Sequence, residues 1–102
     1  MEASLETEAR ERTKALIDFC ENFTTVSSQP TIEEIRQFYQ KLDTWDKKPL
    51  NDKKLNHVVG KLGAFVQMYV NKKDEGRSET AYKNLKLFCD GVANGFYLNE
   101  NI

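Results

Sequence analysis

The stretch Pro30–Trp45, PTIEEIRQFYQKLDTW, is the clearest helical segment of this 102-residue chain. Thr31 follows the proline and Glu34 stands three residues later, which is the spacing of a capping box. The apolar side chains then recur every three or four residues, at Ile32, Ile35, Tyr39 and Leu42. This period predicts an amphipathic helix over about residues 31–45, with one apolar face turned toward a core.

The same period appears upstream of this segment. It runs through about residues 5–24 and is clearest at Leu16, Phe19, Cys20 and Phe23. The acidic start of this stretch suits the positive end of a helix dipole. The turn-forming run TTVSSQP then separates it from the second helix.

Two further helices are predicted downstream. The connection DKKPLND contains a proline and two candidate helix caps, Asn51 and Asp52. A third helix follows over about residues 52–72, with its apolar face formed by Leu55, Val58, Val59, Leu62, Val66, Tyr69 and Val70. Ser78 is a candidate cap for a fourth helix over about residues 78–94. Gly60 and Gly63 interrupt the third helix, and we expect them to let a neighbouring helix approach closely.

Four amphipathic helices with short connections, and no alternating strand pattern, predict an all-α protein. Because short loops make successive helices antiparallel, we expect an antiparallel up-down-up-down four-helix bundle. At this length, residues 1–102 should form a single helical-bundle domain, with residues 95–102 as a C-terminal tail.

Charge is balanced overall but unevenly distributed. The net charge of -1 provides no general attraction to nucleic acid or anionic lipid. Residues 1–24 nevertheless carry six acids against three bases, and residues 41–73 carry eight lysines against three aspartates. These segments are either solvated helix faces that attract one another within the fold or, for the lysines, a docking patch for an acidic partner.

The sequence also bears on compartment. Cys20 and Cys89 show no CxxC spacing, and the first residues, MEASLETEARERTK, lack the apolar core of a signal peptide. We therefore expect a reduced, cytoplasmic protein. No window approaches the roughly 18 apolar residues that span a bilayer, so we expect no integral membrane protein, although a place at the inner face of the membrane stays open.

Residue types that carry catalysis are scarce, which favours a protein without enzymatic activity. His57 is the single histidine, and no GxSxG motif accompanies it. Two distant cysteines and one histidine are too few for a zinc site, and no ExxH motif supports a di-iron centre. We expect no catalytic residue, cofactor or metal.

The glycines of Phe88–Asn101, FCDGVANGFYLNEN, belong to a helix end rather than to a phosphate loop. A phosphate loop leads from a strand into a helix and is followed by a lysine. Gly95 instead follows Asn94 and can take the left-handed conformation that ends a helix. The aromatic tail then either folds back over the core or forms part of a recognition surface. The candidate partner-binding residues are Asn94, Phe96, Tyr97, Leu98 and Asn99, together with Lys47, Lys48, Lys53 and Lys54.

From Thr31 to its end the chain resembles the immunity proteins of class II bacteriocins, in particular the enterocin A immunity type. The matching stretches are FYQKLD, KKPLNDKKLNHVVGKL and GVANGFYLNEN. The resemblance implies a four-helix bundle that protects a bacteriocin producer without catalysis. Such proteins associate with the membrane sugar-phosphotransferase permease that serves as the bacteriocin receptor. The resemblance also implies that the residues that determine specificity lie near the C-terminus, here residues 94–101.

A second resemblance leads to another function. TIEEIRQFY and LKLFCDGVANGFY are similar to the small helical subunit of type III CRISPR effector complexes, which would make the lysine-rich segment a nucleic-acid contact. The scarcity of arginine and the slightly acidic balance disfavour this interpretation. A helical adaptor that binds a protein through one bundle face is a third interpretation.

Overall fold

The computed structural model describes residues 2–98, and over this range the chain is helical without any strand. The elements are α1 (Glu2–Thr24), a short 3-10 helix η1 (Val26–Ser28), α2 (Ile32–Lys47), α3 (Lys53–Asp74) and α4 (Glu79–Ala93). This confirms the predicted all-α class, and each helix boundary lies within about three residues of the expected one. The short helix η1 was not expected.

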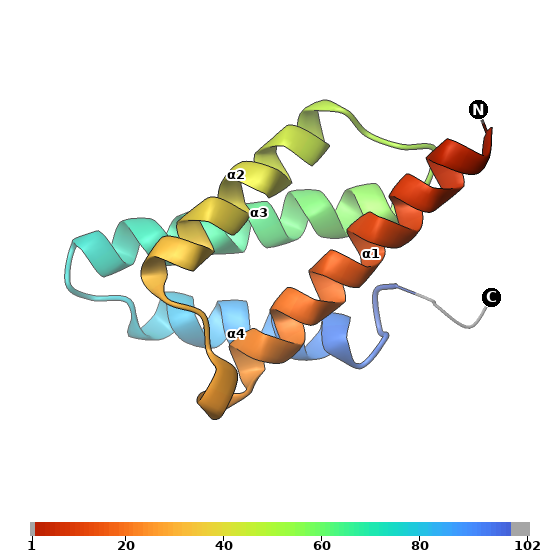
Figure 1. Cartoon of the computed structure of the whole chain (residues 1–102). Helices are drawn as coiled ribbons and strands as arrows, with labels where there is room; N and C mark the ends of the chain where they lie inside the picture. Colours follow the sequence, from red (N-terminus) through yellow and green to blue (C-terminus); the bar gives the residue numbers. More distant parts are fainter. Residues whose placement is uncertain (1, 99–102) are drawn as a thin grey trace.

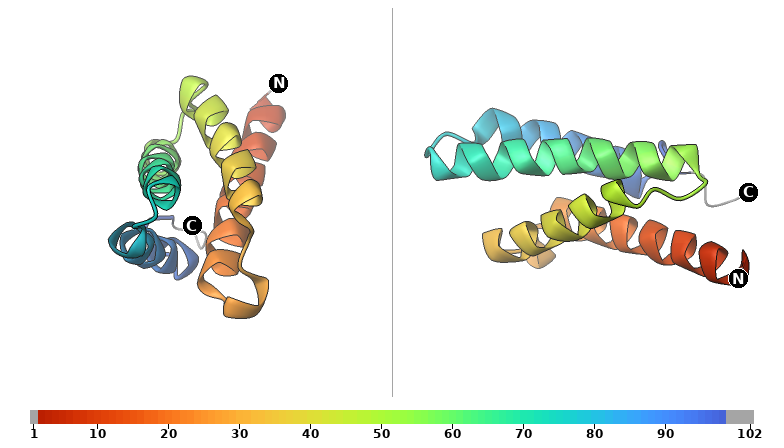
Figure 2. Two further views of the ribbon diagram at one scale, coloured as in Figure 1. Left: turned by 90° about the vertical axis from the view of Figure 1, so that its left-hand side faces the viewer. Right: turned by 90° about the horizontal axis from the view of Figure 1, so that it is seen from above.

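The four helices form an antiparallel up-down-up-down bundle made of two layers. Helices α1 and α2 form one layer and α3 and α4 the other, and the two layers cross obliquely (Figure 1, Figure 2). Helix α1 packs mainly on α4, α2 packs on α3, and α3 packs on α4. Side chains rather than backbones bring α1 and α2 together: the Phe19 and Phe38 rings stack with centroids 4.2 Å apart.

The core lies between these layers and is built from the apolar stripes expected of the sequence. Each helix contributes residues that are almost completely buried, among them Leu16, Cys20, Phe23, Ile35, Leu42, Leu55, Val58, Leu62, Val66, Leu85, Cys89 and Val92. Both cysteines are reduced and buried. A hydrogen bond with the Cys20 thiol, together with burial, raises the pKa of Cys89 above its ordinary value.

Side-chain caps define two of the helix starts as predicted. The Glu34 N–H donates to Thr31 Oγ1 at 3.1 Å, and the Thr31 N–H donates to Glu34 Oε1 at 2.9 Å, so the capping box is confirmed. These bonds lower the pKa of Glu34. Asp52 rather than Asn51 caps α3, because its Oδ1 accepts from the Leu55 N–H at 3.0 Å.

The predicted cap of α4 is wrong in one respect. Ser78 occupies the N-cap position, but its side chain accepts no hydrogen bond from the helix. Its backbone has ψ near 6°, whereas Thr31 and Asp52 are extended. Since capping side chains usually depend on the extended conformation, the Ser78 hydroxyl does not reach the first turn.

The role expected for the α3 glycines is also wrong. A Cβ at Gly63 would meet nothing within 4 Å, and one at Gly60 would only reach Asp46 Oδ1 at 3.6 Å, an ordinary contact. The two glycines instead lie in a shallow groove of about 200 Å³ between α2 and α3. Packing of α2 on α3 therefore does not require either glycine.

Arg12 is a structural residue that the sequence analysis did not single out. Although it is charged, only 3% of its surface is exposed. Its Nη1 donates to the Lys48 carbonyl at 2.9 Å, its Nη2 pairs with Glu8 at 3.2 Å, and its guanidinium lies 5.6 Å from the Trp45 ring centre. The cation thus meets the negative C-terminal end of α2 and ties α1 to it.

The two layers differ in charge. Helices α1 and α2 together contain ten acidic and six basic residues, whereas α3 and α4 contain three acidic and seven basic ones. The first layer is therefore negative and the second positive, and the layers attract one another across the core. Among the described residues, no helix combines the length and apolar character that crossing a membrane requires.

Candidate functional site

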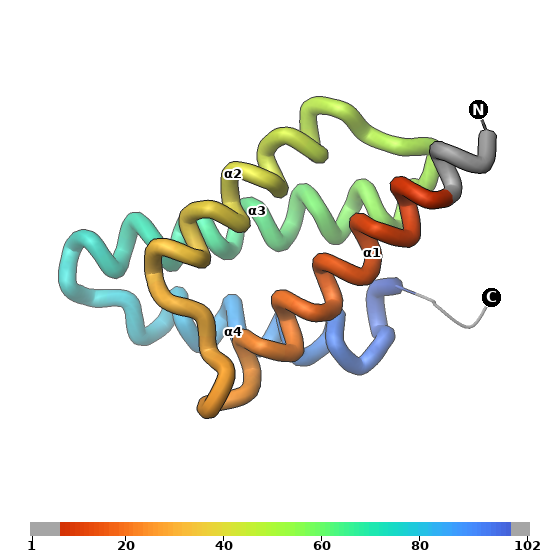
Figure 3. Tube along the Cα trace, viewed as in Figure 1, coloured from red at the N-terminus to blue at the C-terminus, as the bar shows by residue number. Residues whose placement is uncertain are grey.

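The candidate site begins where α4 ends, at a glycine in the left-handed conformation. Gly95 has φ of 81°, which confirms the expected helix ending. Its N–H donates to the Val92 carbonyl at 3.1 Å, and the Phe96 N–H donates to the Gly91 carbonyl at 2.9 Å. These are the two bonds of a Schellman motif, and after them the chain turns away from the axis of α4 (Figure 3).

The tail residues that follow have different surroundings, and the expected folding back over the core holds for only part of the tail. Leu98 is buried in the core, and the Tyr97 ring stacks on Phe88 with centroids 4.7 Å apart. Phe96, in contrast, exposes 80% of its surface. Tyr97 and Leu98 therefore cover the core, while Phe96 remains available to another molecule.

Gly91 makes this arrangement possible, a role that the sequence analysis missed. It is buried on α4, and a Cβ at this position would overlap the Tyr97 ring. The ring can lie flat on the helix only because residue 91 has no side chain. A glycine four residues before the glycine that ends a helix, followed by an aromatic pair, is the signal that could have indicated this contact.

The start of α3 lies beside the tail. Lys53, Lys54 and His57 line a shallow cavity of about 360 Å³ together with Gly95, Phe96 and Tyr97. Both lysines are exposed, and neither forms an ion pair with a described residue. We call the set Lys53, Lys54, His57, Phe96 and Tyr97 the tail–lysine surface.

The electrostatics of this surface are positive. Between Lys53 and Lys73 the sequence has no acidic residue. The Asp52 carboxylate at the start of α3 is held on the Leu55 N–H as a helix cap. The positive end of the α3 dipole adds to the lysine charges, so an acidic or anionic group is attracted to the neighbourhood of Phe96.

Four of the nine residues expected to bind a partner come together here, namely Lys53, Lys54, Phe96 and Tyr97. Four of the others lie apart from this surface or serve the fold. Asn94 donates from Nδ2 to the Asp90 carbonyl at 2.8 Å, and Leu98 is in the core. Lys47 pairs with Asp43 at 3.0 Å on α2, and the Lys48 carbonyl accepts from Arg12. Asn99 lies outside the described residues.

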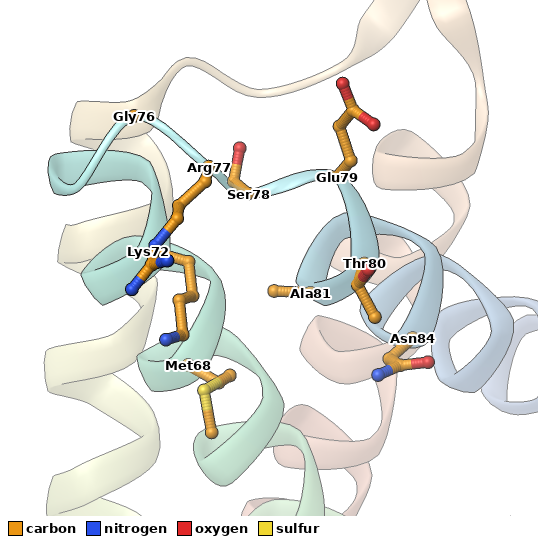
Figure 4. Close-up of a pocket in the computed structure, with 9 residues that line it drawn as sticks. All are labelled: Met68, Lys72, Gly76, Arg77, Ser78, Glu79, Thr80, Ala81 and Asn84. Carbon is orange, nitrogen blue, oxygen red and sulfur yellow. The ribbon is translucent and has the colours of Figure 1, made fainter.

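A larger groove lies at the opposite end of the α3–α4 hairpin. It has a volume of about 850 Å³ and is lined by residues of α3, α4 and their connection (Figure 4). Met68 and Lys72 of α3 lie across it from Thr80 and Asn84 of α4. Its cations are already engaged, since Lys72 and Arg77 both pair with Glu75, at 3.7 and 3.2 Å.

The tail–lysine surface presents an exposed ring, two free ammonium groups and an imidazole, without a nucleophile placed against a base. Within residues 2–98, no three His, Cys, Asp or Glu side chains gather in a way that could hold a metal ion. The chain matches no family model, no curated protein and no solved structure.

Proposed function

We propose that this chain is a non-enzymatic immunity protein, which protects a bacteriocin producer by binding the bacteriocin receptor complex from the cytoplasm. The observation that carries the proposal is the exposed ring of Phe96, which lies beside two α3 lysines that pair with no described residue and is followed by two tail residues packed on the core. The same C-terminal segment carries specificity in the immunity proteins that the sequence resembles.

Physical reasoning favours a contact role for Phe96. Burying a phenylalanine side chain contributes roughly 1.5–3 kcal/mol, and aromatic side chains often dominate the energy of protein interfaces. Lysines around such a ring contribute mainly to the rate and specificity of association, because they attract acidic surfaces before contact. The tail–lysine surface combines the two features within one small area.

In this proposal the partner is a membrane sugar-phosphotransferase permease with bound bacteriocin. An acidic cytoplasmic segment of the permease meets Lys53 and Lys54, and an apolar side chain of that segment covers Phe96. The bound immunity protein then holds the receptor complex in a closed arrangement. No cofactor or metal takes part.

Expression in a bacteriocin-sensitive strain tests the proposal. Cells that produce the wild-type chain should survive at least one member of a panel of class II bacteriocins. Phe96→Ser should reduce that protection without changing the melting temperature, whereas Val26→Ser, at a site 93% exposed in η1, should leave protection unchanged. Unchanged killing of wild-type-expressing cells by the whole panel would refute the proposal.

The same surface favours a second candidate function, the small subunit of a type III CRISPR effector complex. Proteins bind single-stranded nucleic acid by combining aromatic rings, on which bases stack, with basic residues that contact the phosphates of the nucleic-acid backbone. Phe96 beside Lys53 and Lys54 provides both. Fluorescence anisotropy with labelled single-stranded RNA should then show binding that weakens with salt and with Phe96→Ser. An RNA that remains unbound at low salt would exclude this candidate.

A further inference from the structure

The α3–α4 layer presents large apolar side chains to solvent on the side that faces away from α1 and α2. Leu87 is 70% exposed, and it lies two positions before Cys89, which contacts Cys20 of α1. Residues two positions apart point to nearly opposite sides of a helix, so Leu87 points away from α1. Met68 is 52% exposed and lies two positions after the buried Val66 on α3, so its side chain points to the side of α3 opposite Val66.

The tail extends this apolar side of the layer. Leu87 lies one helical turn before Gly91, on which the Tyr97 ring rests, and Phe96 adjoins Tyr97. Met68 and the start of α3 are separated by 15 residues of helix, or roughly 20 Å. The exposed apolar residues are therefore distributed along the layer. We call these four apolar residues and the three exposed lysines of α3 near them the outer face: Met68, Leu87, Phe96, Tyr97, Lys53, Lys54 and Lys61.

The outer face is basic as well as apolar. The sequence has no acidic residue from Lys53 to Lys73 of α3 or from Thr80 to Cys89 of α4. Lys53, Lys54 and Lys61 are exposed and form no ion pair within residues 2–98. The Asp74 carboxylate pairs with Arg36 of α2 at 2.7 Å, and Asp90 is half-buried. The acidic α1–α2 layer forms the opposite side of the molecule (Figure 2).

From this combination we infer that the outer face docks reversibly on an anionic lipid surface. Lysines near such a surface are attracted by its negative potential, each strengthening binding about fivefold. Phenylalanine and leucine side chains enter the boundary between headgroups and acyl chains. The acidic layer is repelled, so only one orientation is favoured. The inference rests on the proposed function solely for the choice of membrane, the inner leaflet around the permease.

The outer face as a whole fits a lipid surface better than it fits a single acidic peptide, because a peptide such as the proposed permease segment would cover only the tail–lysine surface at one end of it. A peptide groove would concentrate its apolar contacts in one cleft, but Phe96 and Met68 stand near opposite ends of the layer. The cleft beside Met68 also has its cations paired with Glu75. A planar surface can contact both ends and the lysines between them at once.

Co-sedimentation with vesicles tests the inference. Full-length protein should sediment at low salt with vesicles of phosphatidylglycerol and phosphatidylcholine, and remain in solution with phosphatidylcholine alone. The double variant Lys53→Gln/Lys54→Gln should weaken partitioning by roughly 10- to 30-fold. Leu87→Ser/Phe96→Ser should weaken it at least about tenfold, because two apolar side chains no longer enter the interface.

Matched controls separate this face from a general charge effect. Lys41→Gln/Lys47→Gln removes the same charge from α2 and should change partitioning by less than about threefold, because exposed charges farther from the membrane are screened by salt. Val26→Ser should have no effect. Equal binding to neutral vesicles, an equal loss in the α2 variant, or no binding to anionic vesicles would each overturn the inference.

The vesicle and protection experiments distinguish a failure of the lipid inference from a failure of the proposed function. If the wild-type chain protects cells but does not bind anionic vesicles, the lipid inference falls and the immunity proposal stands. If it binds vesicles as described but protects against no bacteriocin, the lipid inference stands alone. Displacement from vesicles by single-stranded RNA at matched charge concentration would overturn the lipid inference in favour of a nucleic-acid surface.

Discussion

Phe96 and Tyr97 are neighbours in the chain but have different physical roles. The Tyr97 ring is held between Phe88 and the bare backbone of Gly91, whereas Phe96 has no comparable site on the protein. The difference follows from the Schellman turn at Gly95, which directs Tyr97 and Leu98 back onto α4 and the core. Gly95 therefore provides the turn, and Gly91 provides the surface on which the Tyr97 ring packs.

The pairing of Gly91 with Tyr97 predicts a non-additive effect of mutation. In the wild-type chain, Gly91→Ala gains up to about 1 kcal/mol of helix propensity but displaces Tyr97 from its stacking on Phe88, so stability should change little or fall. In a Tyr97→Ala background the clash is absent, and the same change should stabilise by about 0.5–1 kcal/mol. Urea unfolding of the four proteins measures the coupling. Equal effects in both backgrounds would show that the ring does not rest on Gly91.

At the scale of helices, local sequence signals predicted much of what the structure contains. The capping box at Thr31, the Asp52 cap and the left-handed Gly95 each depend on residues within about four positions, so their signals can be read from a short stretch. The prediction from Gly63, that a neighbouring helix approaches closely there, is wrong. A glycine within a helix indicates possible close approach, but whether a neighbour is actually there depends on the placement of another helix.

Two glycines should therefore respond to alanine in opposite directions. Gly63→Ala should raise the free energy of unfolding by about 0.5–1 kcal/mol, because alanine favours helix and the added Cβ meets nothing within 4 Å. Gly95→Ala should lower it by about 1 kcal/mol, because φ of 81° is strained for any residue with a Cβ. Thermal or urea unfolding gives both values. A stabilising Gly95→Ala would mean that α4 continues through this residue in solution.

The connection between α1 and α2 depends on Arg12 rather than on close backbone packing. Arg12→Met keeps most of the apolar stem but removes the donors to the Lys48 and Trp45 carbonyls, and should destabilise the fold by about 2 kcal/mol. Lys14→Met is the matched control. Its exposed pair with Asp18 should contribute at most about 0.5 kcal/mol. Similar losses in the two variants would assign Arg12 no special role.

For the whole molecule, the decisive contacts join segments that are far apart in the chain. The tail reaches the start of α3 some 40 residues upstream, and Arg12 reaches Lys48, and neither pairing leaves a local signal in the sequence. The uneven charge was visible, but its meaning depended on packing. Lys47 and Lys72 form ion pairs, whereas Lys53, Lys54 and Lys61 form none with the residues that the structure describes. The two ion pairs are local, between residues three or four positions apart, and the docking-patch interpretation of the other lysines stays a prediction.

Packing of the two layers should protect the buried thiols of Cys20 and Cys89 from chemical modification. Cys20 of α1 and Cys89 of α4 are both fully buried, and their mutual hydrogen bond and burial raise the pKa of Cys89, which disfavours the reactive thiolate. A thiol reagent should therefore modify the native protein at least about 1000-fold more slowly than the unfolded chain, and both thiols at the same rate, since one opening event exposes both. Ser27→Cys, exposed in η1, is the positive control and should react quickly. Mass spectrometry of the time course resolves the sites. Fast modification of one thiol alone would show that a local opening exposes that residue without separating α1 from α4.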